Sequence, residues 1–304
     1  SFLAPLVQQQ RLQGVEDHMH IDEVRLRDDN LLFYCSYTFG IIDATDAQAM
    51  DYLAQDLKHT VPSTTRQPGC IHVSWDDTDY SIAYTTHRGN IRNAAYLSGW
   101  DITDPEAPVQ IPAIQEEGTK YEGLDVLGGF VYVGLREEGL GVYTRDPTDD
   151  TLTRVATLTG FEQAWGVRAR ADNKVFITDG IGGLVAVDVT DPLVPVILGT
   201  VALGGIARDV VLDGDYAYVA TGSAGVAVVD VSNLASMQLV ARIEMPGSAI
   251  RVAHSEGLLH VAAWNDARTY DVSTPTSPKF IGAARVTQRD DDIVDPDRPD
   301  STMR

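Results

Sequence analysis

A repeated segment constrains the fold of this chain more than any other feature of its sequence. Five apolar runs end in Asp, any residue, and then Thr or Ser; their aspartates are Asp43, Asp101, Asp188, Asp230 and Asp271. The last three are 42 and 41 residues apart, and the double gap between Asp101 and Asp188 holds a related run, GLGVYT, with Thr144 at the aspartate position. The spacing therefore predicts six repeat units of about 42 residues.

Each unit contains several short runs in which apolar and polar residues alternate. In the fourth unit these runs are VRAR, KVFITDG, GLVAVDVT and PVILGTV, within residues 167–201. Alternation over a few residues rich in Val, Tyr and Phe predicts strands, and polar segments between the runs predict turns. Four strands per unit without a helical period predict an all-β fold, a six-bladed β-propeller with four-stranded antiparallel blades over residues 1–286. We expect each Asp-x-Thr/Ser segment to cap a turn before the outermost strand.

The two ends of the chain are less regular. The run PLVQQQRL, residues 5–12, resembles an outermost strand. It either closes the ring beside the last unit in place of residues 278–286 or lies elsewhere as an extra edge strand. Residues 287–304 are rich in Asp and Pro and predict an acidic tail or linker. Its aspartates, among them Asp290, Asp291 and Asp292, are also candidate Ca²⁺ ligands, although the regular spacing of a calcium loop is missing.

Two segments carry a resemblance to a known family. GLVAVDVTDPLVPVILGTV and GVAVVDVSNLASMQLVARIEM are similar to the LVIVD repeats of bacterial and archaeal β-propellers, which are often secreted or attached to the cell surface. The resemblance extends over roughly residues 15–286 and implies a propeller with an extracytoplasmic location, but it brings no catalytic motif. No signal segment precedes the first repeat, so we expect a mature or trimmed product.

The charge of the chain excludes some partners. Its formal net charge is −21, with 44 acidic and 23 basic residues. A surface that binds nucleic acid or anionic lipid needs clustered Lys and Arg, so we expect neither partner. No apolar run reaches the roughly 18–20 residues that a membrane span requires, so membrane insertion is not expected.

The loops of one propeller face supply the candidate binding residues. Loops that enter the innermost strands and loops between second and third strands open on the same face, which we call the funnel face. They differ from unit to unit, as a site for one asymmetric ligand requires. The candidates are Glu122, Arg136, Trp165, Arg208, Arg251, Trp264 and Asp266. The arginines would clamp a small anionic ligand or a protein partner between tryptophan walls; alternatively, they pair with neighbouring acids, as in Arg208-Asp209 and Arg136-Glu137.

A second set of funnel residues consists of histidines. His18 and His20 form a His-x-His motif, and His72 and His87 come from the next unit on the same face. Imidazole ligands suit Zn²⁺ or another first-row divalent ion. Because His-x-His is a common sequence, surface or hydrogen-bonded histidines are the alternative reading.

The chain has two cysteines, Cys35 and Cys70. Cys35 ends a second strand and Cys70 precedes the next innermost strand, so a disulfide between adjacent blades is geometrically feasible and would indicate an oxidising compartment. The sequence alone favours two buried free thiols.

Three functions fit these features. The first is a secreted or cell-surface binding module that uses the funnel face. The second is a metal-assisted hydrolase or lyase with its active site in the funnel. The third is a structural subunit of a surface assembly.

Overall fold

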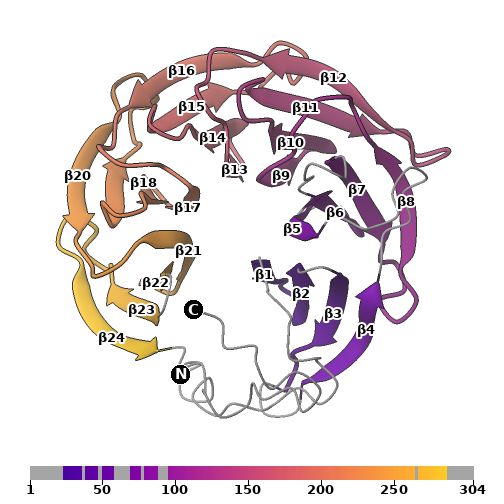
Figure 1. The fold of residues 1–304 in the computed structure, drawn as a ribbon, viewed down its shortest axis with the longest axis horizontal. Coiled ribbons are helices and arrows are strands. Elements are labelled where there is room, and N and C mark those ends of the chain that lie inside the picture. Colours follow the sequence, from indigo (N-terminus) through magenta and orange to yellow (C-terminus); the bar gives the residue numbers. More distant parts are fainter. Residues whose placement is uncertain are drawn as a thin grey trace, which may run out of the picture.

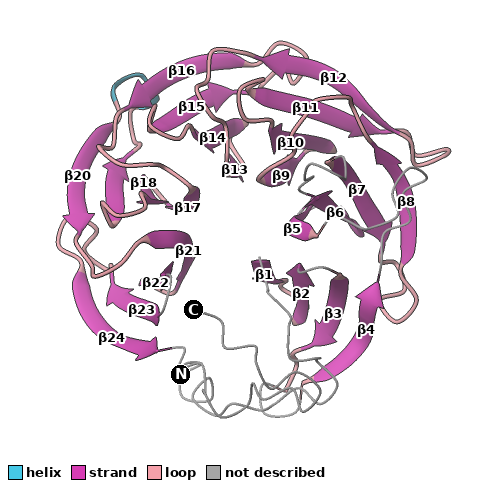
Figure 2. Ribbon diagram, viewed as in Figure 1, coloured by secondary structure: helices cyan, strands magenta, loops and turns pink. Residues whose placement is uncertain are grey.

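The computed structural model describes residues 23–35, 38–46, 50–57, 69–76, 79–87, 95–263 and 266–285. These residues form six four-stranded antiparallel sheets arranged as the blades of a ring (Figures 1 and 2). Within each blade the strands follow in chain order from the centre of the ring to its rim. The structure therefore confirms the predicted six-bladed propeller.

The innermost strand of each blade lines the centre of the ring, and the second strand pairs with it. The innermost strands of blades 1 to 6 are β1 (Glu23–Leu26), β5 (Cys70–Asp76), β9 (Leu124–Leu127), β13 (Val167–Arg170), β17 (Asp209–Asp213) and β21 (Ala249–Ser255). The second strands are β2 (Leu31–Cys35), β6 (Asp79–His87), β10 (Phe130–Gly134), β14 (Lys174–Thr178), β18 (Tyr216–Ala220) and β22 (Leu258–Ala263).

The third and outermost strands complete each blade. The third strands are β3 (Phe39–Asp43), β7 (Tyr96–Asp101), β11 (Leu140–Arg145), β15 (Leu184–Asp188), β19 (Val226–Asp230) and β23 (Asp266–Asp271). The outermost strands are β4 (Asp51–Leu57), β8 (Val109–Ile114), β12 (Leu152–Leu158), β16 (Val196–Val201), β20 (Gln238–Ile243) and β24 (Lys279–Arg285). The 3-10 helix η2 (Leu234–Ser236) precedes β20. No helix among the described residues is long and apolar enough to span a membrane.

The hydrophobic core lies between the blades. The described residues form five apolar clusters, one at each junction from blades 1 and 2 to blades 5 and 6. Third strands such as β15 are buried on both faces because a neighbouring blade packs on each side, which explains their continuous apolar sequence. At the junction of blades 6 and 1 the described residues form no such cluster.

The repeated aspartates cap turns, as the sequence predicts. The carboxylate of Asp188 accepts hydrogen bonds from the backbone N–H and hydroxyl of Thr190 at 2.9 and 2.6 Å, and these bonds lower the pKa of Asp188. The same backbone bond recurs at 2.8–2.9 Å after each of the other four aspartates. In blade 3, where the aspartate is replaced by Thr144, Asp146 makes this bond with Thr148 at 2.8 Å. The turn is thus retained with a shift of two residues.

Acidic residues also brace the innermost strands. Carboxylates of Glu23, Asp125 and Asp209 each accept the backbone N–H of the innermost strand of the next blade at 2.9 Å. Isolated backbone bridges join blades 3 to 6 at their funnel ends, pairing residue 136 with 164, 180 with 207, and 222 with 249. Neighbouring loops of the funnel face are therefore held in fixed positions.

The outermost position of blade 6 belongs to β24, which pairs with β23 from Lys279 to Arg285. The N-terminal run 5–12 therefore does not displace residues 278–286 from this edge. The run itself lies outside the described residues, as does the predicted acidic tail, 287–304.

Candidate functional site

Three predicted site residues occupy the same position in successive blades. Glu122, Trp165 and Arg208 each lie just before the inner edge of blades 3, 4 and 5, and each donates its backbone N–H to the carbonyl of the last residue of β10, β14 or β18 at 2.8–2.9 Å. The backbone is the same at these three positions, whereas the side chains are an acid, an indole and a guanidinium. The funnel loops therefore differ from blade to blade, as predicted, in their side chains, while their backbone positions are repeated.

Glycines allow these loops to approach one another closely. A Cβ atom on Gly123 would lie 2.5 Å from the backbone oxygen of Trp165, and one on Gly166 would lie 2.9 Å from the backbone oxygen of Arg208. The backbone N–H of Gly123 donates to that Trp165 oxygen at 2.9 Å. Only glycine fits at such contacts, so Gly123 and Gly166 fix the positions of Trp165 and Arg208.

Trp165 lies in contact with two arginines. The guanidinium carbon of Arg208 is 4.8 Å from the indole centroid, and that of Arg136 is 5.3 Å from it. Arg136 has a positive φ of 52° and pairs through its backbone with residue 164, just before the tryptophan. The arginines come from blades 3 and 5, and the tryptophan from blade 4 between them. This three-blade cluster is held by cation–π attraction.

The two arginines differ in their charge balance. Arg136 donates to the buried carboxylate of Glu122 at 2.5 Å. Its sequence neighbour Glu137 instead lies 4.0 Å from Lys120. Within the described parts of the chain, Arg208 makes neither a side-chain hydrogen bond nor an ion pair, and the carboxylate of the adjacent Asp209 accepts the backbone N–H of Val252 in blade 6. Arg136 is therefore paired with an acid, as the alternative reading expects, but with Glu122 in place of the adjacent Glu137. Arg208 has no acidic partner among the described residues.

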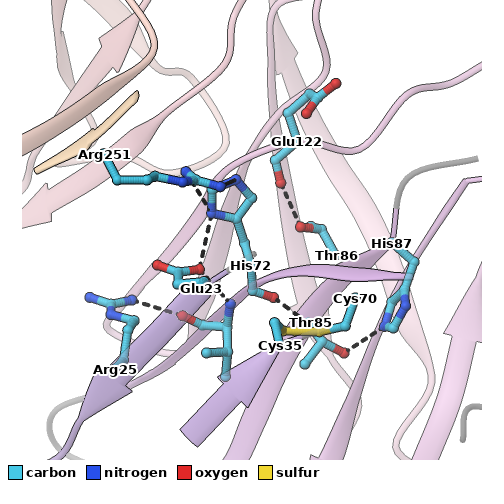
Figure 3. Close-up of a disulfide and its surroundings, with 11 residues drawn as sticks. Glu23, Arg25, Cys35, Cys70, His72, Thr85, Thr86, His87, Glu122 and Arg251 are labelled. Atoms are coloured by element: carbon cyan, nitrogen blue, oxygen red, sulfur yellow. Dashed lines mark hydrogen bonds and ion pairs between the residues drawn. A yellow bond between two sulfur atoms is a disulfide. The ribbon is translucent and has the colours of Figure 1, made fainter. Parts of the chain in front are cut away.

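Arg251 lies in a separate network with His72 and Glu23 (Figure 3). Its guanidinium contacts Nε2 of His72 at 3.1 Å, while Nδ1 of His72 lies 3.0 Å from the Glu23 carboxylate. A carboxylate only accepts, so Nδ1–H of His72 donates to Glu23, while the guanidinium of Arg251 lies against both ring nitrogens, 3.1 Å from Nε2 and 3.4 Å from Nδ1. Burial raises the pKa of Glu23, but His72, Arg25 and Arg251 together lower it well below its ordinary range. The network joins blades 6, 1 and 2.

The predicted metal ligands are not gathered around one point in the described structure. His72 uses its ring nitrogens as above, whereas His87 hydrogen-bonds Thr85 at 3.1 Å and stacks on Tyr96 at 4.2 Å. In Figure 3 the two imidazoles lie apart. Among the residues with a described position, no group of three His, Cys, Asp or Glu side chains is arranged for a metal ion. His18 and His20 lie outside those residues, so the metal site stays a prediction.

Cys35 and Cys70 form a disulfide, in place of the two free thiols that the sequence favoured (Figure 3). Their Cα atoms are 5.0 Å apart, within the usual range for a disulfide. The bond joins the end of β2 to the start of β5. It therefore links blades 1 and 2 near the level at which backbone bridges link later blades.

The remaining candidates do not join the cluster around Trp165. Asp266, at the start of β23, forms an ion pair with Arg268 at 2.7 Å. Trp264 lies outside the described residues. The sequence reasoning did not select Ile181 and Ile206, which are 70% and 43% exposed on the funnel face. Their signal in the sequence is an isoleucine inside a glycine-rich loop, in GIGG and GGIA.

Two surface hollows lie toward the rim of the funnel face. One is lined by residues that include Glu137, Glu138 and Arg154, and the other by residues that include Gly204, Arg242 and Met245. Neither is lined by Trp165, Arg136 or Arg208.

Comparisons of the structure define the class of protein as a β-propeller. The chain is similar to the periplasmic gluconolactonase PpgL of Pseudomonas aeruginosa, with a TM-score of 0.69, 14% identity, and coverage of 84% of this chain and 83% of the other. It is also similar to the Cps50 (Swd1) propeller domain of Myceliophteria thermophila, with a TM-score of 0.69, 13% identity, and coverage of 90% and 88%. At these identities the similarity shows the fold alone.

The repeat type is defined by sequence. Residues 171–202, 204–244 and 246–285 match the LVIVD repeat. The resemblance predicted over roughly residues 15–286 is therefore confirmed for blades 4, 5 and 6. No curated protein matches the chain. The protein is thus a six-bladed propeller with LVIVD repeats in its second half.

Proposed function

We propose that this protein is an extracytoplasmic binding propeller whose funnel face holds a partner through Arg208 and Trp165. One observation carries the proposal: the guanidinium of Arg208 lies on an indole without an acidic partner among the described residues. The indole attracts this half-buried cation but carries no opposite charge, and no counter-charge among the described residues compensates for its lost hydration. Binding of an anionic group restores that compensation, and Arg and Trp are the residues that most often dominate binding interfaces.

The extracytoplasmic location rests on two features. LVIVD repeats are typical of extracellular bacterial proteins. The Cys35–Cys70 disulfide persists in oxidising compartments and is rare in the cytosol. Mass spectrometry of the protein isolated from its host under alkylating conditions tests the location. The proposal expects the intact disulfide in the extracytoplasmic fraction, and recovery of the reduced protein in the cytosol would contradict it.

Site-specific photo-crosslinking tests the binding face. A photo-reactive residue replaces Ser223, in the exposed β18–β19 loop on the funnel face, or Leu193, in the exposed β15–β16 loop on the opposite face. We expect a defined cross-linked species from position 223 only, and its loss in the Arg208→Gln background. Equal products from both faces, or a product at position 223 that does not depend on Arg208, would overturn the proposal.

A further inference from the structure

Resting on the proposed function, we infer that the funnel surface formed by Trp165, Ile181, Ile206 and Arg208 binds a protein segment of a separate partner. The segment presents an Asp or Glu carboxylate next to an aliphatic side chain. The carboxylate pairs with Arg208, and the aliphatic side chain packs on the two isoleucines. We call these four residues the Arg208 surface.

The two isoleucines form the apolar part of this surface. The backbone N–H of Ala207 donates to the carbonyl of Gly180 at 2.8 Å, in an antiparallel bridge. Ile181 follows one bridge residue and Ile206 precedes the other, so both isoleucines lie next to this bridge between blades 4 and 5. Both are exposed, although the core of this junction is complete beneath them. They therefore form a small apolar patch on a rigid base.

Arg208 places a cation beside this patch. It lies two residues after Ile206, and its guanidinium is kept in position by the Trp165 ring at 4.8 Å. The second arginine on that ring, Arg136, is neutralised by Glu122 at 2.5 Å. The charge available to a partner is therefore that of Arg208, whose planar fork matches a carboxylate.

The mixed chemistry of the surface favours a peptide over a small anion. Apolar contact with two exposed isoleucines requires an apolar group attached to the anion. An acidic segment with an aliphatic residue supplies both.

The net charge of the protein makes the role of Arg208 easy to test. With a formal charge of −21, the chain as a whole repels an acidic segment. Long-range attraction therefore does not hold the segment, and its binding depends on short-range contact at Arg208. Removal of this one guanidinium should remove the preference for a carboxylate.

Fluorescence anisotropy with the full chain tests the inference. The probe is a fluorescein-labelled 12-residue peptide with the central sequence Asp-Ile-Asp in a Gly/Ser background. Matched probes carry Asn-Ile-Asn or Asp-Ser-Asp. We expect the Asp-Ile-Asp probe to bind about tenfold more tightly than either of the others, since each loses one of the two contacts.

Variants assign the binding to the Arg208 surface. Arg208→Gln should reduce binding of the Asp-Ile-Asp probe to the level of the Asn-Ile-Asn probe, and Ile181→Ser should weaken it about three- to tenfold. Arg170→Gln is the matched control, because Arg170 pairs with Asp172 at 2.8 Å on the opposite face. It should leave the affinity unchanged. Thermal melts of all variants exclude unfolding as the cause of lost binding.

Three outcomes would overturn the inference. They are equal binding of the three probes, binding that survives Arg208→Gln, and binding that appears only in a full-length Asp290→Asn, Asp291→Asn, Asp292→Asn variant. The last would assign the surface to the chain's own acidic segment. If the probes fail while the cross-link at position 223 persists, the binding function stands and only the partner chemistry is wrong. Loss of both would overturn both proposals.

Discussion

Arg251 and His72 are 179 residues apart in the chain, yet the guanidinium of one lies 3.1 Å from Nε2 of the other. Arg251 belongs to blade 6 and His72 to blade 2, so the contact passes over the inner edge of blade 1, where Glu23 binds the other side of the imidazole. The described residues form no apolar cluster between blades 6 and 1. The network of Glu23, His72 and Arg251 therefore joins blades 6, 1 and 2 through polar side chains.

A double-mutant cycle on His72→Ala and Arg251→Ala should give a coupling free energy of unfolding of about 1–2 kcal/mol. The reason is that the contact is half-buried and joins two blades. Chemical denaturation of the four proteins measures this coupling. The control cycle on Arg170 and Asp172, an exposed pair at 2.8 Å, should give less than about 0.5 kcal/mol. Equal coupling in the two cycles would contradict a special role for the network.

Acid should weaken the folded state through Glu23. Its pKa is lowered on folding, so the ionised carboxylate contributes stability above the ordinary value of 4.5. That stability is lost progressively as the pH falls below 4.5 toward the lower folded-state pKa. In Glu23→Gln we expect lower stability at pH 7, by about 1–3 kcal/mol, and a smaller decrease between about pH 5 and pH 2. Urea denaturation at several pH values measures both. If the unfolding free energy of Glu23→Gln falls with decreasing pH as steeply as that of the wild type, other carboxylates dominate the loss of stability in acid.

Removal of the disulfide should destabilise the junction of blades 1 and 2. The bond closes a loop with a sequence separation of 35 residues, and loss of such a constraint costs about 2–4 kcal/mol. We expect this decrease in unfolding free energy for the Cys35→Ser/Cys70→Ser variant. Wild-type protein should show a similar decrease in reductant, whereas the variant should not respond to it. A reductant effect of equal size in the variant would assign the decrease to another cause.

The glycine before β9 should be essential for the position of Trp165. In Gly123→Ala the new methyl group would lie 2.5 Å from the Trp165 backbone oxygen, so we expect a loss of about 1–3 kcal/mol in unfolding free energy. Gly282→Ala in β24 is the matched control, since its methyl group would meet no atom within 4 Å. Thermal and urea denaturation compare the two variants. Equal stability of both variants would show that the close contact between Gly123 and Trp165 does not limit the packing of blades 3 and 4.

The arginines of the funnel face show which part of the site the sequence could predict. The sequence selected Glu122, Trp165 and Arg208 because they precede innermost strands at the same place in the repeat, and the structure gives them equivalent backbone positions. It left open whether Arg136 and Arg208 bind a ligand or pair with the acids next to them in the chain. Arg136 lies between β10 and β11 with a φ of 52°, and its partner is Glu122, which precedes β9; Asp209 reaches the next blade.

The repeat by itself determined the fold of this protein, because strand alternation and turn-forming aspartates are local properties that recur every 42 or so residues. The tertiary structure alone decided which side chains meet between blades. It joined Cys35 to Cys70, brought Arg251 to His72, and left Arg208 on an indole with two isoleucines exposed nearby. Such contacts depend on the curvature of the ring and on the distance at which blades pack. Neither is encoded in the spacing of residues along the chain.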